Sequence, residues 1–290
     1  MKIALIYFSG SGNTNIVVSK YEESLKNLGF EVSKFNIENS LDKIPNLDSF
    51  YKVGFFYPIH GFNSPNIVVK FAKKIEKSTS KRNYFVVMVS GEPLNLNHSS
   101  NSRLIRVLKK KNYYLESEYH YVLGYNLVFR HTEEKAYRMY DVMEKIIPLD
   151  TKEYFVENKT NKLKRVFLGS FLSFLLRIQF PFYKVNGKLF RINNKKCIKC
   201  MMCMNNCPVH NITYSKNKFH FSSKCLMCAR CSFSCPKDAV RIGILNFWRV
   251  NGKYKYKPTS IQEVDKHSRY CKKSFKRYFD KAEERINKAQ

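Results

Sequence analysis

The chain has 290 residues, of which 44% are hydrophobic, and it carries 52 Lys and Arg residues against 23 Asp and Glu residues. This apolar fraction excludes a disordered chain, and no apolar run reaches the roughly 18 uncharged residues of a membrane-spanning helix. The formal net charge of +29 is unevenly placed, because residues 151–290 hold 31 of the basic residues and only 8 of the acidic ones. This basic half predicts contact with an acidic partner, a nucleic acid or an anionic membrane surface, and charge alone does not choose among them.

Short apolar runs alternate with helical spacing through the first half of the chain. Runs rich in Val, Ile, Tyr and Phe predict strands at residues 3–8, 32–37, 53–57, 84–89 and 119–123. The spacing of apolar residues between them predicts helices at residues 15–28, 64–78, 99–112 and 132–147. Gly29 follows the first helix as a C-cap. We therefore expect a doubly wound α/β domain with a parallel sheet over residues 1–150, whose ligand lies at the carboxyl ends of the strands.

Residues 151–192 form a connector that is first polar and then apolar, and basic residues flank its apolar part. One hypothesis is a helix that lies in a membrane interface through residues 163–183. The alternative, which we favour, is a helix packed between two domains, because apolar residues surround this helix and leave no wide polar face. The rest of the chain divides into a cysteine-rich unit at residues 193–245 and a basic, aromatic tail at residues 246–290. Within that tail, a helix is predicted at residues 261–288.

Eight of the nine cysteines form two copies of one spacing, 28 residues apart. In each copy, three cysteines at steps of three residues precede a fourth that is followed by proline: Cys197, Cys200, Cys203 and Cys207, then Cys225, Cys228, Cys231 and Cys235. This is the ligand spacing of bacterial-type iron–sulfur sites, in which the fourth cysteine serves the other cluster. We expect one 4Fe–4S cluster on Cys197, Cys200, Cys203 and Cys235, and a second on Cys225, Cys228, Cys231 and Cys207. Structural zinc fits this spacing poorly, because its ligands usually come as two separated Cys-x-x-Cys pairs.

The distribution of cysteine also bears on the compartment. A secreted disulfide scaffold is short, cysteine-rich throughout and led by a signal peptide. This chain instead opens on a brief apolar run and a glycine-rich polar turn, without a small-residue cleavage pattern. We therefore expect a cytoplasmic protein whose reduced thiols are available as metal ligands. Cys271, outside both copies, is expected to be a plain thiol in a helix.

A glycine-rich turn follows the first predicted strand and opens a helix, with the sequence Ser9-Gly10-Ser11-Gly12-Asn13-Thr14. Backbone N–H groups and hydroxyls at such a turn suit a phosphate group. Walker A is excluded, because no Gly-Lys-Ser/Thr ends the turn. A dinucleotide fingerprint lacks its third glycine, since Asn15 stands there, and Glu38 is the only feature in its favour. An ordinary βα turn with a Ser or Asn cap remains an alternative to a phosphate site.

This hydroxyl-rich turn resembles the phosphate loop of flavodoxins, and the resemblance covers residues 1–148. It implies FMN, with the phosphate held by Ser9, Ser11, Asn13, Thr14 and the backbone of Gly12. It also implies that the loops after the third and fourth strands hold the flavin ring, with candidates Tyr57, His60, Gly61, Phe62, Ser90 and Gly91. Residues 193–242 resemble two-cluster bacterial ferredoxins in all eight ligands. Together the halves resemble clostridial-type flavodoxin–ferredoxin fusion proteins.

The resemblance implies an electron carrier that passes electrons between an FMN and two 4Fe–4S clusters and on to a redox partner, with no acid, base or nucleophile. We expect that partner to be acidic at its docking face. The alternative is a flavin-dependent reductase of an organic substrate, with His60, His98 and His131 as candidate proton donors. Nucleic-acid binding by the lysines and tyrosines of the tail is not expected, because a solvated basic helix face explains them more simply.

Overall fold

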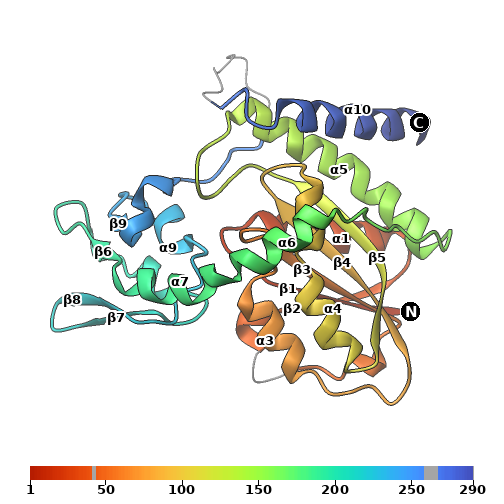
Figure 1. Cartoon of the computed structure of the whole chain (residues 1–290), viewed down its shortest axis with the longest axis horizontal. Helices are drawn as coiled ribbons and strands as arrows, with labels where there is room; N and C mark the ends of the chain where they lie inside the picture. Colours follow the sequence, from red (N-terminus) through yellow and green to blue (C-terminus); the bar gives the residue numbers. More distant parts are fainter. Residues whose placement is uncertain (41–43, 258–266, 290) are drawn as a thin grey trace.

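The structure is a computed structural model that describes residues 1–40, 44–257 and 267–289. Its larger part is a five-stranded parallel sheet in the order β2-β1-β3-β4-β5 (Figure 1). This is the strand order of the flavodoxin-like doubly wound fold, so the predicted fold class is confirmed. The strands are β1 Lys2–Tyr7, β2 Glu31–Asn36, β3 Lys52–Pro58, β4 Arg82–Ser90 and β5 Tyr113–Val122.

Helices cover both faces of this sheet, because successive strand residues point to opposite faces and both faces are apolar. In β1, Ile3 and Leu5 belong to the core under α1 and α5, whereas Ala4 and Ile6 belong to the core under α3 and α4. The helices around the sheet are α1 Asn13–Asn27, α2 Ile37–Ser40, η1 Leu47–Ser49, α3 Asn66–Lys74, η2 Asn95–Ser99, α4 Ser102–Lys109 and α5 Glu133–Phe155.

Every predicted strand and helix of the first half is present, with some shifted bounds. The helix predicted at residues 99–112 is split into η2 and α4. The helix predicted to end at residue 147 continues to Phe155, with Pro148 inside it. Tyr154 and Phe155, in the added turns, are buried in the core on the α1 side, so burial extends this helix beyond what local spacing indicates. Gly29 has a φ of 81°, which a C-cap glycine adopts readily.

The smaller lobe is built from short elements around a small apolar core. Two antiparallel pairs form its sheets, β6 Arg191–Ile192 with β9 Val240–Arg241, and β7 Ile212–Ser215 with β8 Lys218–Phe221. Its helices are α8 Met202–Asn205, α9 Arg230–Phe233 and η4 Gly243–Trp248. A lobe of this size has little apolar surface to bury, so bound metal is expected to organise it.

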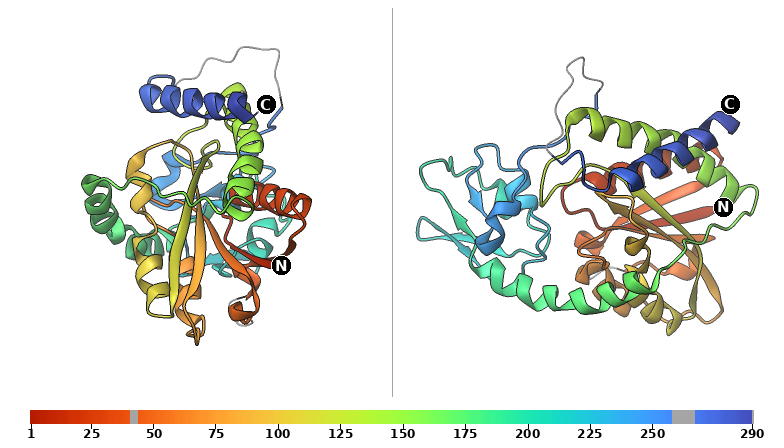
Figure 2. Two further views of the ribbon diagram at one scale, coloured as in Figure 1. Left: turned by 90° about the vertical axis from the view of Figure 1, so that its right-hand side faces the viewer. Right: turned by 45° about the horizontal axis from the view of Figure 1, so that its top comes forward.

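The connector runs from the sheet to the smaller lobe as two helices, α6 Phe167–Leu175 and α7 Gln179–Lys188, joined by η3 Leu176–Ile178 (Figure 2). Within α6, only Gly169 and Ser173 are buried. Gly169 lies against η2, where an added Cβ would stand 2.8 Å from the carbonyl oxygen of Leu96. The α6 helix therefore packs through its small residues, and most of its large apolar side chains stay exposed. In the described part of the chain, no helix is long and apolar enough to cross a membrane.

The C-terminal tail packs back onto the larger part of the molecule. Its helix, α10 Lys272–Ala289, lies beside α5 (Figures 1 and 2) and buries Phe275, Phe279 and Ala282. The helix predicted from residue 261 therefore begins later, and residues 261–266 of that prediction lie outside the described residues. Cys271 stands immediately before α10, with a φ of 53°.

Candidate functional site

A cavity of about 490 Å³ lies at the carboxyl ends of the parallel strands, where the fold places a ligand. Its walls come from the loops after β1, β3, β4 and β5, from the connector and from the smaller lobe. The volume is in the range of small-molecule and cofactor sites. Nine residues that the sequence singles out line it, namely Ser9, Ser11, Asn13, Thr14, His60, Gly61, Phe62, Ser90 and Gly91.

Two other residues of that set do not line the cavity. Tyr57 has no exposed surface and lies in the core, with its hydroxyl 3.3 Å from Oγ of Ser100. Gly12 lines a shallower neighbouring pocket and has a φ of 121°, which favours glycine. The structure therefore leaves Tyr57 as a packing residue, and Gly12 as the residue that turns the chain into α1.

Among the candidate histidines, only His60 lines the cavity. His98 is held elsewhere, with Nδ1 2.9 Å from the carbonyl oxygen of Lys164. Nε2 of His131 lies 3.2 Å from the carbonyl oxygen of Gly91, behind the cavity wall. Burial lowers the pKa of His60 to about 4, so this imidazole is neutral at pH 7.

The turn between β1 and α1 presents unpaired polar groups to the cavity. The N-cap residue of α1, Gly12, offers no capping side chain, and among the first N–H groups of the helix that of Asn15 donates to Oγ of Ser9 at 3.1 Å. The hydroxyl of Thr14 is buried and has no hydrogen-bond partner, and the same is true of Oδ1 of Asn126. Both residues line the cavity. The orphaned hydroxyl of Thr14 can donate and lies beside a helix N-terminus, so it fits an anionic ligand. Oδ1 of Asn126 can only accept, so it fits a hydroxyl or N–H group of a ligand.

Glu92 is a cavity residue that the sequence did not single out. Its carboxylate accepts hydrogen bonds from the hydroxyl of Tyr125 and, at 3.1 Å, from Nδ2 of Asn97. Burial raises the pKa of Glu92, and the hydrogen bonds from Tyr125 and Asn97 only partly oppose that rise. The sequence offered one indication of this residue, because Glu92 directly follows Gly91 in a loop already expected to hold a ligand.

The segment from Tyr125 to His131, in which only His131 had a predicted role, joins the two parts of the molecule. Asn126 donates through Nδ2 to Oγ of Ser11, in the glycine-rich turn. The N–H of Val128 donates to the carbonyl of Trp248 at 2.7 Å. Arg130 donates to three consecutive carbonyls of the tail, at residues 251–253. The segment thus forms one cavity wall and also fixes the smaller lobe.

Two tyrosines of the basic tail, the buried Tyr254 and the partly buried Tyr256, pack near the cavity. The hydroxyl of Tyr254 donates to the carbonyl of Tyr125 at 3.1 Å and accepts from the N–H of His131 at 2.9 Å. The hydroxyl of Tyr256 donates to Oδ1 of Asn13 at 2.9 Å. Both hydroxyls therefore tie the tail to the residues around the cavity.

The cysteines form two groups, each of which combines both copies of the spacing. Cys197, Cys200, Cys203 and Cys235 line one small cavity. Burial raises the pKa of Cys203 to about 11, and the thiols of Cys197, Cys235 and Cys200 are near enough to raise it as well. The structure thus brings the fourth cysteine of the second copy to the first three of the first copy.

The second group has the reciprocal composition. Burial raises the pKa of Cys231 well above its usual range, and the nearby thiols of Cys228, Cys225 and Cys207 add to that rise. Cys203, of the first group, also contributes. The four cysteines of each group therefore lie close together, and the two groups lie close to each other.

The backbone around the cysteines repeats with the same interval as the sequence. Left-handed residues recur 28 positions apart, as in Lys199 and Met227 (φ 53° in both) and in Met201 and Ala229 (φ 59° and 53°). The N–H···Sγ hydrogen bonds repeat as well, from residue 199 to Cys197 at 3.4 Å and from residue 227 to Cys225 at 3.3 Å. Each loop thus turns its N–H groups toward sulfur, an arrangement that stabilises thiolates.

The second cysteine copy touches the glycine-rich turn directly. A Cβ added at Gly10 would stand 3.2 Å from Cβ of Cys228, so any larger residue would require a shift of a few tenths of an ångström at this close approach. Cys228 and Met227 also line the 490 Å³ cavity. The glycine-rich turn and a cysteine of the second group therefore share one wall of this cavity.

Arg230 fastens this contact. Its guanidinium donates to the carbonyls of Ser9 at 2.5 Å and Gly10 at 2.6 Å, and to that of Asn206 at 2.9 Å. It also forms a two-pronged ion pair with Glu38, with one contact of 2.8 Å. Glu38 is therefore occupied by Arg230, which removes the one feature that favoured a dinucleotide site.

Comparison with known proteins gives one family match, to the 4Fe-4S binding domain at residues 190–213. No curated protein matches the chain. Among solved structures, a flavodoxin from Streptococcus pneumoniae TIGR4 is 15% identical, with 52% of this chain and 99% of that chain covered and a TM-score of 0.36. An NAD(P)H:quinone oxidoreductase from Methanothermobacter marburgensis is 10% identical, with 57% and 99% covered and a TM-score of 0.36. At such scores the fold assignment depends on the strand order described above.

Proposed function

We propose that this chain, a flavodoxin-like sheet fused to a 4Fe-4S binding domain, transfers electrons between an FMN in the 490 Å³ cavity and two 4Fe–4S clusters, and on to a redox partner. One observation carries the proposal: Thr14 of the glycine-rich turn and Cys228 of the second cysteine group line the same cavity. FMN exchanges one or two electrons and each cluster exchanges one, so the pair connects two-electron to one-electron chemistry.

The residues present fit the phosphate of FMN. The orphaned hydroxyl of Thr14 and the first backbone N–H groups of α1 would donate to it, and Ser11 lies beside them. His60, Gly61 and Phe62 on one side, and Ser90, Gly91 and Glu92 on the other, would flank the flavin ring. The neutral imidazole of His60 adds no positive charge there.

The thiols also fit clusters. The first group surrounds a space, which suits a cluster that offers one iron to each sulfur. Within the described ranges, no three His, Cys, Asp or Glu side chains form a site for a single metal ion. The raised pKa values of Cys203 and Cys225 mean that these buried thiols release protons when they take metal.

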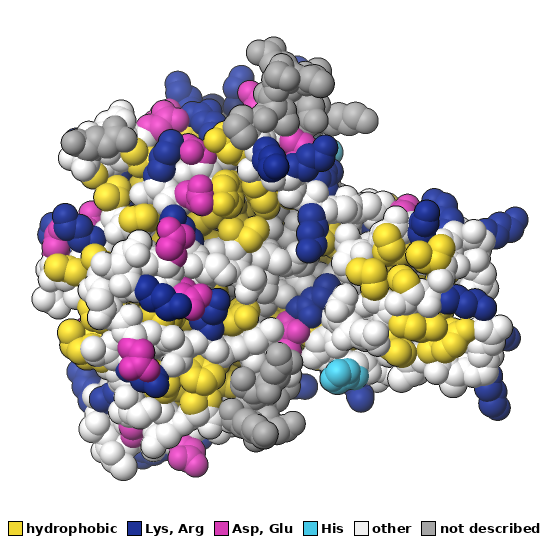
Figure 3. Space-filling model, turned by 180° about the vertical axis from the view of Figure 1, so that it is seen from behind, with side chains coloured by type: hydrophobic (Ala, Val, Ile, Leu, Met, Phe, Trp, Pro, Cys, Tyr) yellow, Lys and Arg dark blue, Asp and Glu magenta, His cyan; other side chains and the backbone are white. Residues whose placement is uncertain are grey.

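The redox partner that we propose is acidic at its docking face, and the compartment is the cytoplasm, where thiols stay reduced. In the view from behind, Lys and Arg side chains surround the smaller lobe, whereas most of the visible Asp and Glu lie on the larger part (Figure 3). Association should therefore weaken as salt is raised.

Anaerobic purification, followed by iron, zinc and flavin assays and a visible spectrum, tests the proposal. We expect about eight irons and one FMN per chain. Zinc in place of iron would contradict the cluster assignment, and a chain that takes up no FMN in titration would contradict the flavin assignment.

Thr14→Val tests the phosphate site, because valine keeps the shape and removes the orphaned hydroxyl. We expect about tenfold weaker FMN binding, the equivalent of one lost hydrogen bond to a charged group, measured by flavin fluorescence quenching. Ser64→Ala is the matched control, since Ser64 also has a buried, unpartnered hydroxyl but does not line the cavity. Equal affinities for the two variants would show that Thr14 does not contact the phosphate.

Glu92 favours a second candidate function, reduction of an organic substrate beside the flavin. A buried carboxyl with a raised pKa lies in the cavity wall, so it holds a proton more readily than an exposed carboxyl does. To separate the two functions, the reduced protein is reoxidised with ferricyanide, which takes electrons only, or with p-benzoquinone, which also takes protons. A reductase would be slowed by Glu92→Gln with the quinone alone, whereas an electron carrier would show no such selectivity.

Glu92 also predicts a pH dependence of stability. Because its pKa is raised in the folded state, the folded chain holds this proton more tightly than the unfolded chain, and stability falls as pH rises through the folded pKa. We expect Glu92→Gln to lack that fall in urea unfolding, followed as the pH rises above the usual carboxyl pKa. Glu134→Gln, an exposed position, should keep the wild-type profile.

A further inference from the structure

The connector displays an unusual amount of large apolar surface. Phe167, Phe174 and Ile178 are 87%, 63% and 73% exposed, and most of the large apolar side chains around them are exposed too. A helix in water normally turns such residues inward and its small residues outward. Here Gly169 and Ser173 are the buried residues of α6, so the arrangement is reversed.

The exposed side chains follow one line along the connector. Seven of them recur at intervals of three or four residues across α6, η3 and α7, which places them on one helical face. We call this set the connector ridge: Phe167, Phe171, Phe174, Ile178, Phe182, Val185 and Leu189. Twenty-three residues at 1.5 Å per residue extend about 35 Å.

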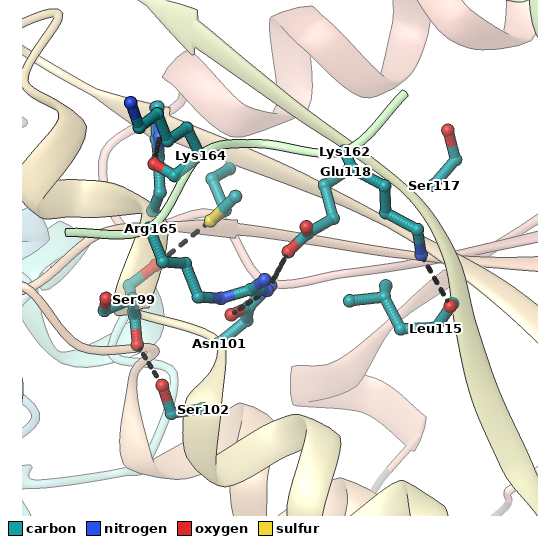
Figure 4. A network of polar contacts seen from close by, with 12 residues as sticks. Ser99, Asn101, Ser102, Leu115, Ser117, Glu118, Lys162, Lys164 and Arg165 are labelled. Atoms are coloured by element: carbon teal, nitrogen blue, oxygen red, sulfur yellow. Dashed lines mark hydrogen bonds and ion pairs between the residues drawn. The ribbon is translucent and has the colours of Figure 1, made fainter. Parts of the chain in front are cut away.

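The start of the connector is held in place on β5 (Figure 4). Glu118 has no exposed surface, and its carboxylate accepts from Nδ2 of Asn101 at 2.5 Å and pairs with Arg165. Lys162 donates to the carbonyl of Leu115 at 2.8 Å (Figure 4). Ser173 and Asn63 bond to each other farther along, at 3.1 Å. The connector ridge is therefore presented by a connector fixed at several points.

Basic residues flank the connector ridge without acidic partners. Arg103, Arg106 and Arg177 form no ion pair among the described residues. Burial is the main cause that lowers the pKa of Arg103 and of Arg177, and the positive charge of Arg106 lowers both further. The three guanidiniums therefore lie near one another. Lys184 and Lys188 are exposed on α7. This clustering of like charges suits a surface that supplies several anions.

We propose that the connector ridge docks on an anionic lipid membrane, with its apolar side chains in the interface and the flanking Arg and Lys residues at lipid phosphates. Aromatic and aliphatic side chains beside cations are the composition of an interfacial helix. A second copy of the chain fits the ridge less well, because a two-fold symmetric contact would bring the basic flank of one copy against the same basic flank of the other. Docking would also place the cavity near the membrane, since Leu176 and Phe182 line it.

The test is vesicle co-sedimentation of the full chain with its cofactors, at physiological salt. Vesicles of phosphatidylcholine alone are compared with vesicles that contain about one-third phosphatidylglycerol, a composition that gives an anionic surface. We expect binding to the anionic vesicles and at least tenfold weaker binding for Phe174→Gln with Ile178→Gln. Lys184→Glu with Lys188→Glu should reduce binding to the anionic vesicles. Phe247→Gln, a position that is also 73% exposed but outside the ridge, is the matched control.

Sedimentation velocity separates the competing result. A dimer that Phe174→Gln with Ile178→Gln dissociates, without vesicle binding, would show that the ridge covers a second copy and would overturn the proposal. A monomer that binds neither vesicle composition would overturn it too. These readouts need no electron transfer, so they stand or fall separately from the proposed function.

Discussion

Cys235→Ser should remove the same cluster as Cys197→Ser, although the two residues lie 38 positions apart. Cys235 lines the cavity formed by Cys197, Cys200 and Cys203, whereas Cys207 lies with the second group. We expect iron to fall from about eight to about four per chain in both variants, with loss of the same cluster signal in electron paramagnetic resonance of the reduced protein.

The reciprocal pair and a control complete this experiment. Cys207→Ser should lose the other signal, together with Cys225→Ser, and Cys271→Ser should keep all the iron because Cys271 belongs to neither group. If Cys235→Ser instead matched Cys225→Ser, each cluster would be held within one copy of the spacing, and the crossed assignment would be wrong.

Arg230→Gln should separate the two halves of the site without removing a cluster ligand. The side chain holds Glu38 and two carbonyls of the glycine-rich turn, and both partners of the ion pair are mostly buried. Breaking such a pair leaves a buried carboxylate uncompensated, so we expect a loss of about 3 kcal/mol in the free energy of unfolding, measured by urea with release of flavin as the signal.

The double-mutant cycle separates the pair from its surroundings. Glu38→Gln with Arg230→Gln should be less destabilised than the sum of the single variants. Arg138→Gln is the matched control, because its pair with Glu283 is half exposed and worth below about 1 kcal/mol. Equal losses in the two arginine variants would show that Arg230 does not fasten the turn to the second cysteine copy.

Sequence alone located the sheet, the ligand edge and the cysteine spacing, because each depends on local periodicity. The central strands β1, β3 and β4 are largely apolar on both faces, and the two cysteine copies repeat at one interval. The burial that extends α5 to Phe155 depends on distant packing, so local spacing ended that helix too early.

The contacts that join the two parts were beyond sequence reasoning. Arg230 reaches Ser9 across more than two hundred residues, and Asn126 reaches Ser11 from a segment without a motif. Tyr57 shows the reverse error: its sequence position suggested a ring beside a flavin, but strand alternation turns it into the core. One residue of register decides between these two environments.

Photoreduction of the flavin under anaerobic conditions tests the central claim most directly, with cluster absorbance followed in the same chain. We expect the clusters to bleach as the flavin reoxidises, at a rate independent of protein concentration, because Cys228 and the glycine-rich turn share one cavity wall. A transfer rate that rises in proportion to protein concentration would show that electrons pass between molecules, and would contradict a route through that wall.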